Sequence, residues 1–154
     1  MKKALIVSNL IFISLTLLLA YILVFTGTEM IETPNDSRVT VKYEPDLKVL
    51  VLSEMRDYLE VMGEIQLGLA TNDPDRIYRA ASTQGQAAID DTPIRLLKLS
   101  PVACKTMGFA GHDLFQAIAD SARLNFKPET TIKQMSELTN NCIVCHQTYK
   151  MELN

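Results

Sequence analysis

The chain has 154 residues, which suits one domain of about 100 to 150 residues with a short additional segment. Its formal net charge of −3 is small. Because nucleic-acid-binding proteins need a basic face, we expect no nucleic-acid partner. Tryptophan is absent, and glycine and proline are few, with six of each, so the composition favours a helical soluble part.

The amino-terminal segment, residues 1–28, is predicted to be a transmembrane anchor. Lys2 and Lys3 precede an apolar run from Ala4 to Phe25, which is about as long as a helix that crosses a bilayer. A cleaved signal peptide would have an apolar core of about 7 to 15 residues and a small-x-small cleavage site, and neither is clear here. The two lysines would stay in the cytoplasm, which puts the rest of the chain across the membrane. We favour the anchor, with a signal peptide as the alternative.

The next segment, residues 29–44, is predicted to be a linker. It is polar and contains Pro34, Asn35, Asp36 and Ser37 in a row, which is typical of a tether. The folded domain is then residues 45–154.

Two helices are predicted at the start of this domain. Apolar side chains recur at steps of three and four from residue 45 to residue 70 and predict an amphipathic helix. They are Val51, Leu52, Met55, Leu59, Met62, Ile65 and Leu69. Asp73 is a good N-cap and Pro74 a good first-turn residue, so a second helix is predicted from there to about residue 88.

Two further helices complete the prediction. Residues 90–101 contain two prolines and are expected to form a loop folded against the core. Gly108 and Gly111 interrupt the next stretch, so the third helix is predicted from about His112 to Leu124, and the fourth begins at Glu129. Four helices with short connections predict an all-α fold, an up-down-up-down four-helix bundle preceded by the transmembrane helix.

The fourth helix carries the strongest motif, Cys142-Ile143-Val144-Cys145-His146. Cys-x-x-Cys-His is the attachment signature of a c-type haem, in which both thiols bond to the porphyrin and the imidazole ligates the iron. On a helix, Cys142 and Cys145 are one turn apart and His146 is four residues after Cys142, so the three side chains share a face. The sequence therefore predicts one covalent haem c, with His146 as the proximal iron ligand.

Other chemistries suit the motif less well. A redox Cys-x-x-Cys of the thioredoxin type needs a preceding strand and a βαβ pattern, and neither is predicted. Structural zinc could use Cys104, His112, Cys142 and Cys145, but this leaves His146 without a role. Cys104 is otherwise expected to be a buried small residue. Paired carboxylates, a serine elbow and a phosphate-binding glycine loop are not evident, so no catalytic role is predicted.

A helical domain with CIVCHQTYK at its carboxyl end resembles the class II cytochromes c, which comprise cytochrome c′ and its low-spin, methionine-ligated relatives. The resemblance covers roughly residues 45–150, and only the haem motif is specific by itself. It implies that the first helix faces the distal side of the haem and that one position there decides the sixth iron ligand. Alignment on Met62-Gly63-Glu64-Ile65 and the turn at Pro74 puts Met55 at that position.

The distal assignment has alternatives. If the register slips by a turn, the position falls on Leu59, which cannot coordinate iron, or on Met62. His112 is a further candidate, although its place at a predicted helix start suggests an exposed or capping histidine. Low-spin relatives often carry an arginine one turn before the ligand, whereas this chain has Val51 there. Arg56 could pair with the haem propionates instead.

These residues predict a function in electron transfer. A His/Met ligand pair leaves no open iron position, so the protein is expected to be a single-electron carrier and not an enzyme. The sequence does not exclude that it is a subunit of an enzyme complex. The resemblance to cytochrome c′ implies one alternative, a five-coordinate haem that binds NO or CO. Another is a haem subunit of a larger membrane redox complex.

Location and partners are predicted from the same resemblance. It implies haem attachment outside the bacterial cytoplasmic membrane, so the predicted location is the inner membrane, in a single pass, with the haem domain in the periplasm. Cleavage of the amino terminus would leave a soluble periplasmic protein. Expected partners are redox proteins and the membrane itself, with a homodimer or a larger complex also possible.

Overall fold

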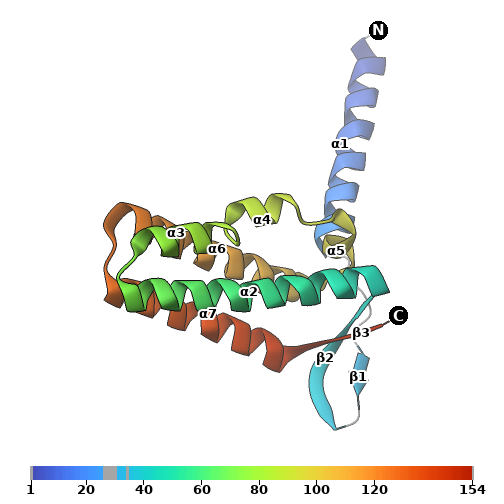
Figure 1. The fold of residues 1–154 in the computed structure, drawn as a ribbon. Helices are drawn as coiled ribbons and strands as arrows, with labels where there is room; N and C mark the ends of the chain where they lie inside the picture. Colours follow the sequence, from blue (N-terminus) through green and yellow to red (C-terminus); the bar gives the residue numbers. More distant parts are fainter. Residues whose placement is uncertain (1, 26–30, 34, 154) are drawn as a thin grey trace.

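The structure is a computed structural model that describes the backbone of residues 2–25, 31–33 and 35–153, and the side chains of 6–22 and 35–153. Its elements follow one another as α1 (Lys2–Phe25), β1 (Ile31–Thr33), β2 (Asp36–Tyr43), α2 (Pro45–Thr71), α3 (Pro74–Ser82), α4 (Gln86–Asp90), α5 (Ile94–Leu99), α6 (Val102–Asn125), α7 (Pro128–Thr148) and β3 (Tyr149–Leu153). Helices α2, α3, α6 and α7 lie together as one body, and the strands gather at one end of it (Figure 1).

The main core lies between these four helices. Each contributes residues that solvent does not reach, including Ile65 of α2, Ile77 of α3, Phe115 and Ile118 of α6, and Leu138 of α7. Burial of such side chains is the dominant favourable term in folding, at about 1.5–3 kcal/mol for each large apolar residue. Ile65 of the stripe predicted for α2 therefore faces the core, whereas Leu59 of the same predicted stripe is exposed.

The junction between α2 and α3 was predicted closely. Helix α2 ends with Asn72 in the left-handed region, at φ 53°, and the Asp73 carboxylate accepts a hydrogen bond from the backbone N–H of Arg76 at 2.9 Å. Gly68 allows the two helices to meet here, because a Cβ at that position would lie 2.6 Å from Cγ1 of Ile77. The predicted cap and the start of α3 at Pro74 are confirmed.

Three helix boundaries differ from the prediction. The second helix ends at Ser82 and resumes as the short α4. The segment expected to be a loop contains α5. Helix α6 begins at Val102, ten residues before His112, and runs through Gly108 and Gly111. A glycine costs only about 1 kcal/mol in a helix interior, and tertiary packing overrides such a cost.

The predicted linker is wrong for residues 36–43, which form β2. In the described part of the chain, the strands make one sheet in the order β1-β2-β3, with β2 antiparallel to β1 and parallel to β3. Val39 of β2 pairs with Tyr149 of β3, so the segment before α2 lies beside the segment after α7. Val41 and Tyr43 form a second, smaller core with Leu47 of α2. The fold is therefore not all-α.

The predicted transmembrane anchor is also corrected. Among the described residues, no helix is both long enough and apolar enough to cross a membrane. The fold class with a transmembrane helix is therefore overturned, and the single-pass anchor in the inner membrane is not supported. Residues 1 and 26–28 of the predicted anchor lie outside the described residues.

Candidate functional site

A cavity lies at the end of the main core that faces the sheet. The space between atoms there is about 900 Å³, a figure that includes open solvent. Its walls come from α2, α6, α7 and the segment around α5, and most of them are apolar. The apolar side chains include Val51, Met55, Leu96, Leu97, Met107 and Phe109.

Helix α7 brings both thiols of the motif to this cavity. Its buried residues Thr131, Met135 and Leu138 face the main core, and the same stripe continues in steps of four and three to Cys142 and Cys145. Both cysteines are half-buried and line the cavity. The helical spacing of the motif therefore has the geometric effect predicted for it, because side chains three and four residues apart share one face.

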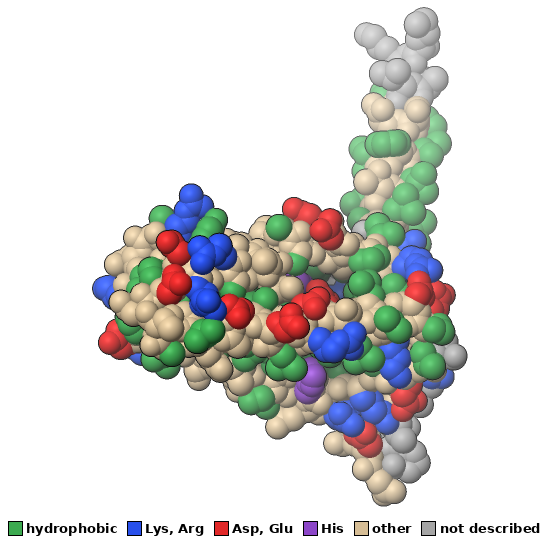
Figure 2. All heavy atoms as spheres, viewed as in Figure 1, with side chains coloured by type: hydrophobic (Ala, Val, Ile, Leu, Met, Phe, Trp, Pro, Cys, Tyr) green, Lys and Arg blue, Asp and Glu red, His purple; other side chains and the backbone are tan. Residues whose placement is uncertain are grey.

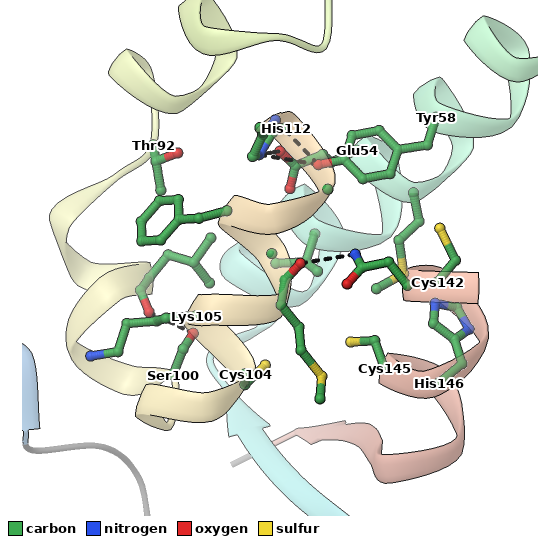
Figure 3. Close-up of a pocket in the computed structure, with 18 of the residues that line it drawn as sticks. Glu54, Tyr58, Thr92, Ser100, Cys104, Lys105, His112, Cys142, Cys145 and His146 are labelled. Carbon is green, nitrogen blue, oxygen red and sulfur yellow. Dashed lines mark hydrogen bonds and ion pairs between the residues drawn. The ribbon is translucent and has the colours of Figure 1, made fainter. Parts of the chain in front are cut away.

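His146 lies at the edge of the same cavity. It is one of the lining residues, yet its side chain is exposed to solvent. Figure 3 shows His146 beside Cys142 and Cys145 on α7, with α6 opposite. The three residues of the motif are thus together at one wall, with the imidazole on the solvent side.

The α2 candidates for a distal ligand differ in their surroundings. Among the described residues, Met55 is the only one of the three that lines the cavity. Leu59 is 69% exposed, and Met62 packs against the main core. Met62 is seven residues after Met55, about 10 Å further along the helix axis, which explains why it reaches a different part of the interior.

His112 is buried, so the prediction of an exposed or capping histidine is wrong. Only 4% of the residue is exposed, because α6 starts ten residues earlier and places it mid-helix. Its Nδ1 lies 2.9 Å from the Gln84 carbonyl oxygen. Its Nε2 lies 3.1 Å from the Tyr58 hydroxyl and 3.4 Å from a Glu54 carboxylate oxygen. Both ring nitrogens therefore have polar partners within the protein.

The pKa values of His112 and Tyr58 are shifted by burial and by the neighbouring Glu54 carboxylate. Burial lowers the pKa of His112, but hydrogen bonds to Glu54 and to the Gln84 carbonyl outweigh it and hold that pKa above its ordinary value. Burial and the neighbouring Glu54 charge both raise the pKa of Tyr58 well above its ordinary value. Tyr58 therefore keeps its proton and can donate a hydrogen bond.

Sequence reasoning missed Glu54 and Tyr58. Both line the cavity, and they are four residues apart, so they occupy one face of α2. A glutamate and a tyrosine inside an otherwise apolar stripe were the available signal. A polar side chain in such a stripe must find a partner when it is buried, but the sequence does not say which residue supplies it.

A shallow groove adjoins the cavity on the face between α2 and α4. The groove and the cavity share Glu54, Thr92 and Leu96 as lining residues, and Asp57 and Asp91 also line the groove. Figure 2 shows the molecule hollowed between these helices, with acidic side chains on both sides of the hollow. Solvent thus reaches Glu54 from the groove, and its side chain is 32% exposed.

The metal-binding character predicted for this protein needs correction. Among the described residues, no group of three or more His, Cys, Asp and Glu side chains could hold a metal ion. This overturns the zinc alternative with Cys104, His112, Cys142 and Cys145, and the described side chains by themselves give no support to a metal-binding protein. A haem site is of another kind, because the porphyrin itself binds the iron and the protein adds only axial ligands.

The largely apolar cavity leaves open space beside α6, across from the α7 thiols. A Cβ at Gly108 of α6 would meet no atom within 4 Å, so open space reaches the helix backbone there. Gly111 also lines the cavity, and nearby the Asn141 amide of α7 donates a hydrogen bond to the Met107 carbonyl oxygen at 3.0 Å. The two glycines that were expected to break α6 instead lie within it and line the cavity without a side chain.

No model of a protein family, no curated protein and no solved structure matches this chain. The resemblance to class II cytochromes c therefore rests on the residues of the motif and on the order of the helices.

Cys104 is half-buried in the first turn of α6 and lines the cavity. Burial raises the pKa of its thiol to about 11, from an ordinary value of 9.0. A rise of two units lowers the thiolate fraction at pH 8 about 100-fold, and the thiolate is the form that reacts. We expect iodoacetamide to modify Cys104 about 100-fold more slowly in the folded protein than in urea.

The alkylation rate at Cys104, followed by peptide mass spectrometry, should also rise about tenfold per pH unit up to about pH 10. Equal rates for the folded and the urea-unfolded protein would show that Cys104 is not buried in the first turn of α6.

Proposed function

We propose that this protein carries one haem c, held by thioether bonds to Cys142 and Cys145 with His146 as the proximal iron ligand, and that it transfers single electrons. The observation that carries the proposal is the placement of both thiols on one face of α7, at a largely apolar cavity. The attachment motif and a space for the attached group thus coincide. The partner we propose is another redox protein.

Met55 is the residue that would supply the second protein ligand to the iron. It lines the same cavity from α2, whereas Leu59 is exposed and Met62 packs in the main core. When bound, such a haem supplies a one-electron exchange between ferric and ferrous iron. The thioether of Met55 favours the ferrous state, and the apolar wall limits the access of water and does likewise.

The test of this assignment is the absorption spectrum of the oxidised protein. We expect the weak far-red band of a thioether bound to ferric haem in the wild type, and its loss in Met55→Ala. After reduction, Met55→Ala should bind carbon monoxide at once, because an axial position is then open. Met62→Ala is the matched control, since it removes a methionine from the same helix and should keep the band.

Two results would contradict the assignment. One is persistence of the far-red band in Met55→Ala. The other is immediate formation of a carbon monoxide complex by the reduced wild type, which would favour the five-coordinate, gas-binding alternative. Absence of any covalently bound haem would overturn the proposed function as a whole.

A further inference from the structure

A polar cluster joins α2 to α6 at the wall of the cavity. His112 of α6 lies at its centre, with the Tyr58 hydroxyl 3.1 Å and a Glu54 carboxylate oxygen 3.4 Å from Nε2. Its Nδ1 is 2.9 Å from the Gln84 carbonyl oxygen, in the segment between α3 and α4. Figure 3 shows the His112 ring directed toward Glu54 and Tyr58 of α2. One buried ring thus connects three segments of the chain.

The two α2 members of this cluster flank Met55. Glu54 comes one residue before it and Tyr58 three residues after it, so both lie within one helical turn of Met55. Because a helix advances about 100° per residue, holding these two side chains fixes the direction in which Met55 points. A rotation of α2 by about 10° would move an atom 5–6 Å from the helix axis by about 1 Å. Functional sites usually need their groups held within about 0.5 Å.

This part of α2 is held by half-buried contacts, among them Val51 against the second core. The buried residues of α2, a helix that is described over its whole length, are Leu47, Val61, Ile65 and Gly68. The stretch between Leu47 and Val61 therefore borders the cavity without one fully buried side chain. The ring of Tyr58 also packs on Phe115 of α6, with centroids 5.0 Å apart. The polar contacts of Tyr58 and Glu54 with His112 thus add to the apolar packing that holds this stretch of α2.

Helix α6, in contrast, is firmly held on this side. His112, Phe115, Ile118 and Ala119 are all buried, and the second nitrogen of His112 is tied to the Gln84 carbonyl. The histidine is therefore a fixed point against which α2 can be oriented. Since both its nitrogens are occupied by protein groups, its role differs from that of an iron ligand.

We propose that His112 is a positioning residue for Met55: it clamps Glu54 and Tyr58 to α6 and so sets the face of α2 that Met55 presents to the cavity. This inference rests on the proposed function. It assigns a role to a histidine whose ring nitrogens contact Glu54, Tyr58 and Gln84 and not the attachment cysteines or the proximal ligand.

The test compares His112→Phe, His112→Gln and Ile118→Val in the intact holoprotein. Phenylalanine fills the space without polar contacts, glutamine keeps a donor and an acceptor, and Ile118→Val is a core change on the same helix that leaves the cluster in place. Mutations of outer-shell partners typically weaken a metal–ligand interaction about 10–100-fold. We therefore expect His112→Phe to lose most of the far-red band, to lower the midpoint potential and to bind carbon monoxide after reduction. His112→Gln should keep most of the band, and Ile118→Val should keep all of it.

Tyr58→Phe tests the clamp if His112→Phe does not fold, because it removes only the hydroxyl and keeps the ring packed on Phe115. A partial loss of the far-red band is expected there. An unchanged band in His112→Phe, or in Tyr58→Phe where His112→Phe is not obtained, would overturn the inference while leaving the proposed function intact. A wild type without covalent haem would overturn the proposed function itself, and a wild type with covalent haem but no far-red band would overturn the role of Met55.

Discussion

Replacement of both Cys142 and Cys145 by serine is expected to abolish covalent haem attachment completely. The thioether bonds need the two thiol sulfurs, and a serine hydroxyl does not replace them in this chemistry. The measurement is haem staining of the protein after denaturing electrophoresis, together with the intact mass. The wild type should stain and show the added mass of one haem, whereas the double variant should do neither.

Cys104→Ser is the matched control, because it changes the same residue type at the same cavity. It should retain the haem. Loss of the haem in Cys104→Ser alone, or staining that persists in the double serine variant, would show that attachment does not use the α7 pair. Each single variant, Cys142→Ser or Cys145→Ser, keeps one sulfur and should hold the haem through one bond.

Phe115→Ala is expected to cause the largest loss of stability, a decrease of about 3–5 kcal/mol in the free energy of unfolding. Phe115 is fully buried in the main core, so the substitution removes a large apolar side chain and leaves a cavity. Domains are stable by only about 5–15 kcal/mol, and the variant would lose a large part of that. Urea unfolding followed by circular dichroism measures the change.

Leu124→Ala, on the same helix, serves as the control for Phe115→Ala. Its side chain is 81% exposed, and exposed substitutions usually change stability by less than about 0.5 kcal/mol. Similar losses for the two variants would mean that the main core does not lie between α2, α3, α6 and α7.

Local signals in the sequence predicted several elements well. The period of apolar residues predicted a helix over residues 45–70, and α2 runs from Pro45 to Thr71. The pair Asp73 and Pro74 predicted the start of α3, because a cap depends on a side chain and a backbone N–H only three residues apart. The stripe of α7 likewise predicted that both thiols face inward, since helical spacing alone determines a shared face.

Other elements depended on partners that are distant in the sequence. Strand β2 pairs with β3, more than 100 residues away, and neither strand has a local pattern strong enough to show this pairing. Gly108 and Gly111 suggested a helix break, yet α6 continues through both, because tertiary packing outweighs a modest propensity cost. The prediction of a transmembrane segment was wrong for the described residues.

The sequence by itself predicted the chemistry proposed for the candidate site, because a Cys-x-x-Cys-His motif needs only five consecutive residues on one helix. It left Met55, Leu59 and Met62 as alternatives, since all three belong to the same helical stripe. Only the tertiary structure separated them, because the position of α2 relative to α6 and α7 brings Met55 to the cavity. The same packing buried His112 against Glu54 and Tyr58, a contact that no local pattern could indicate.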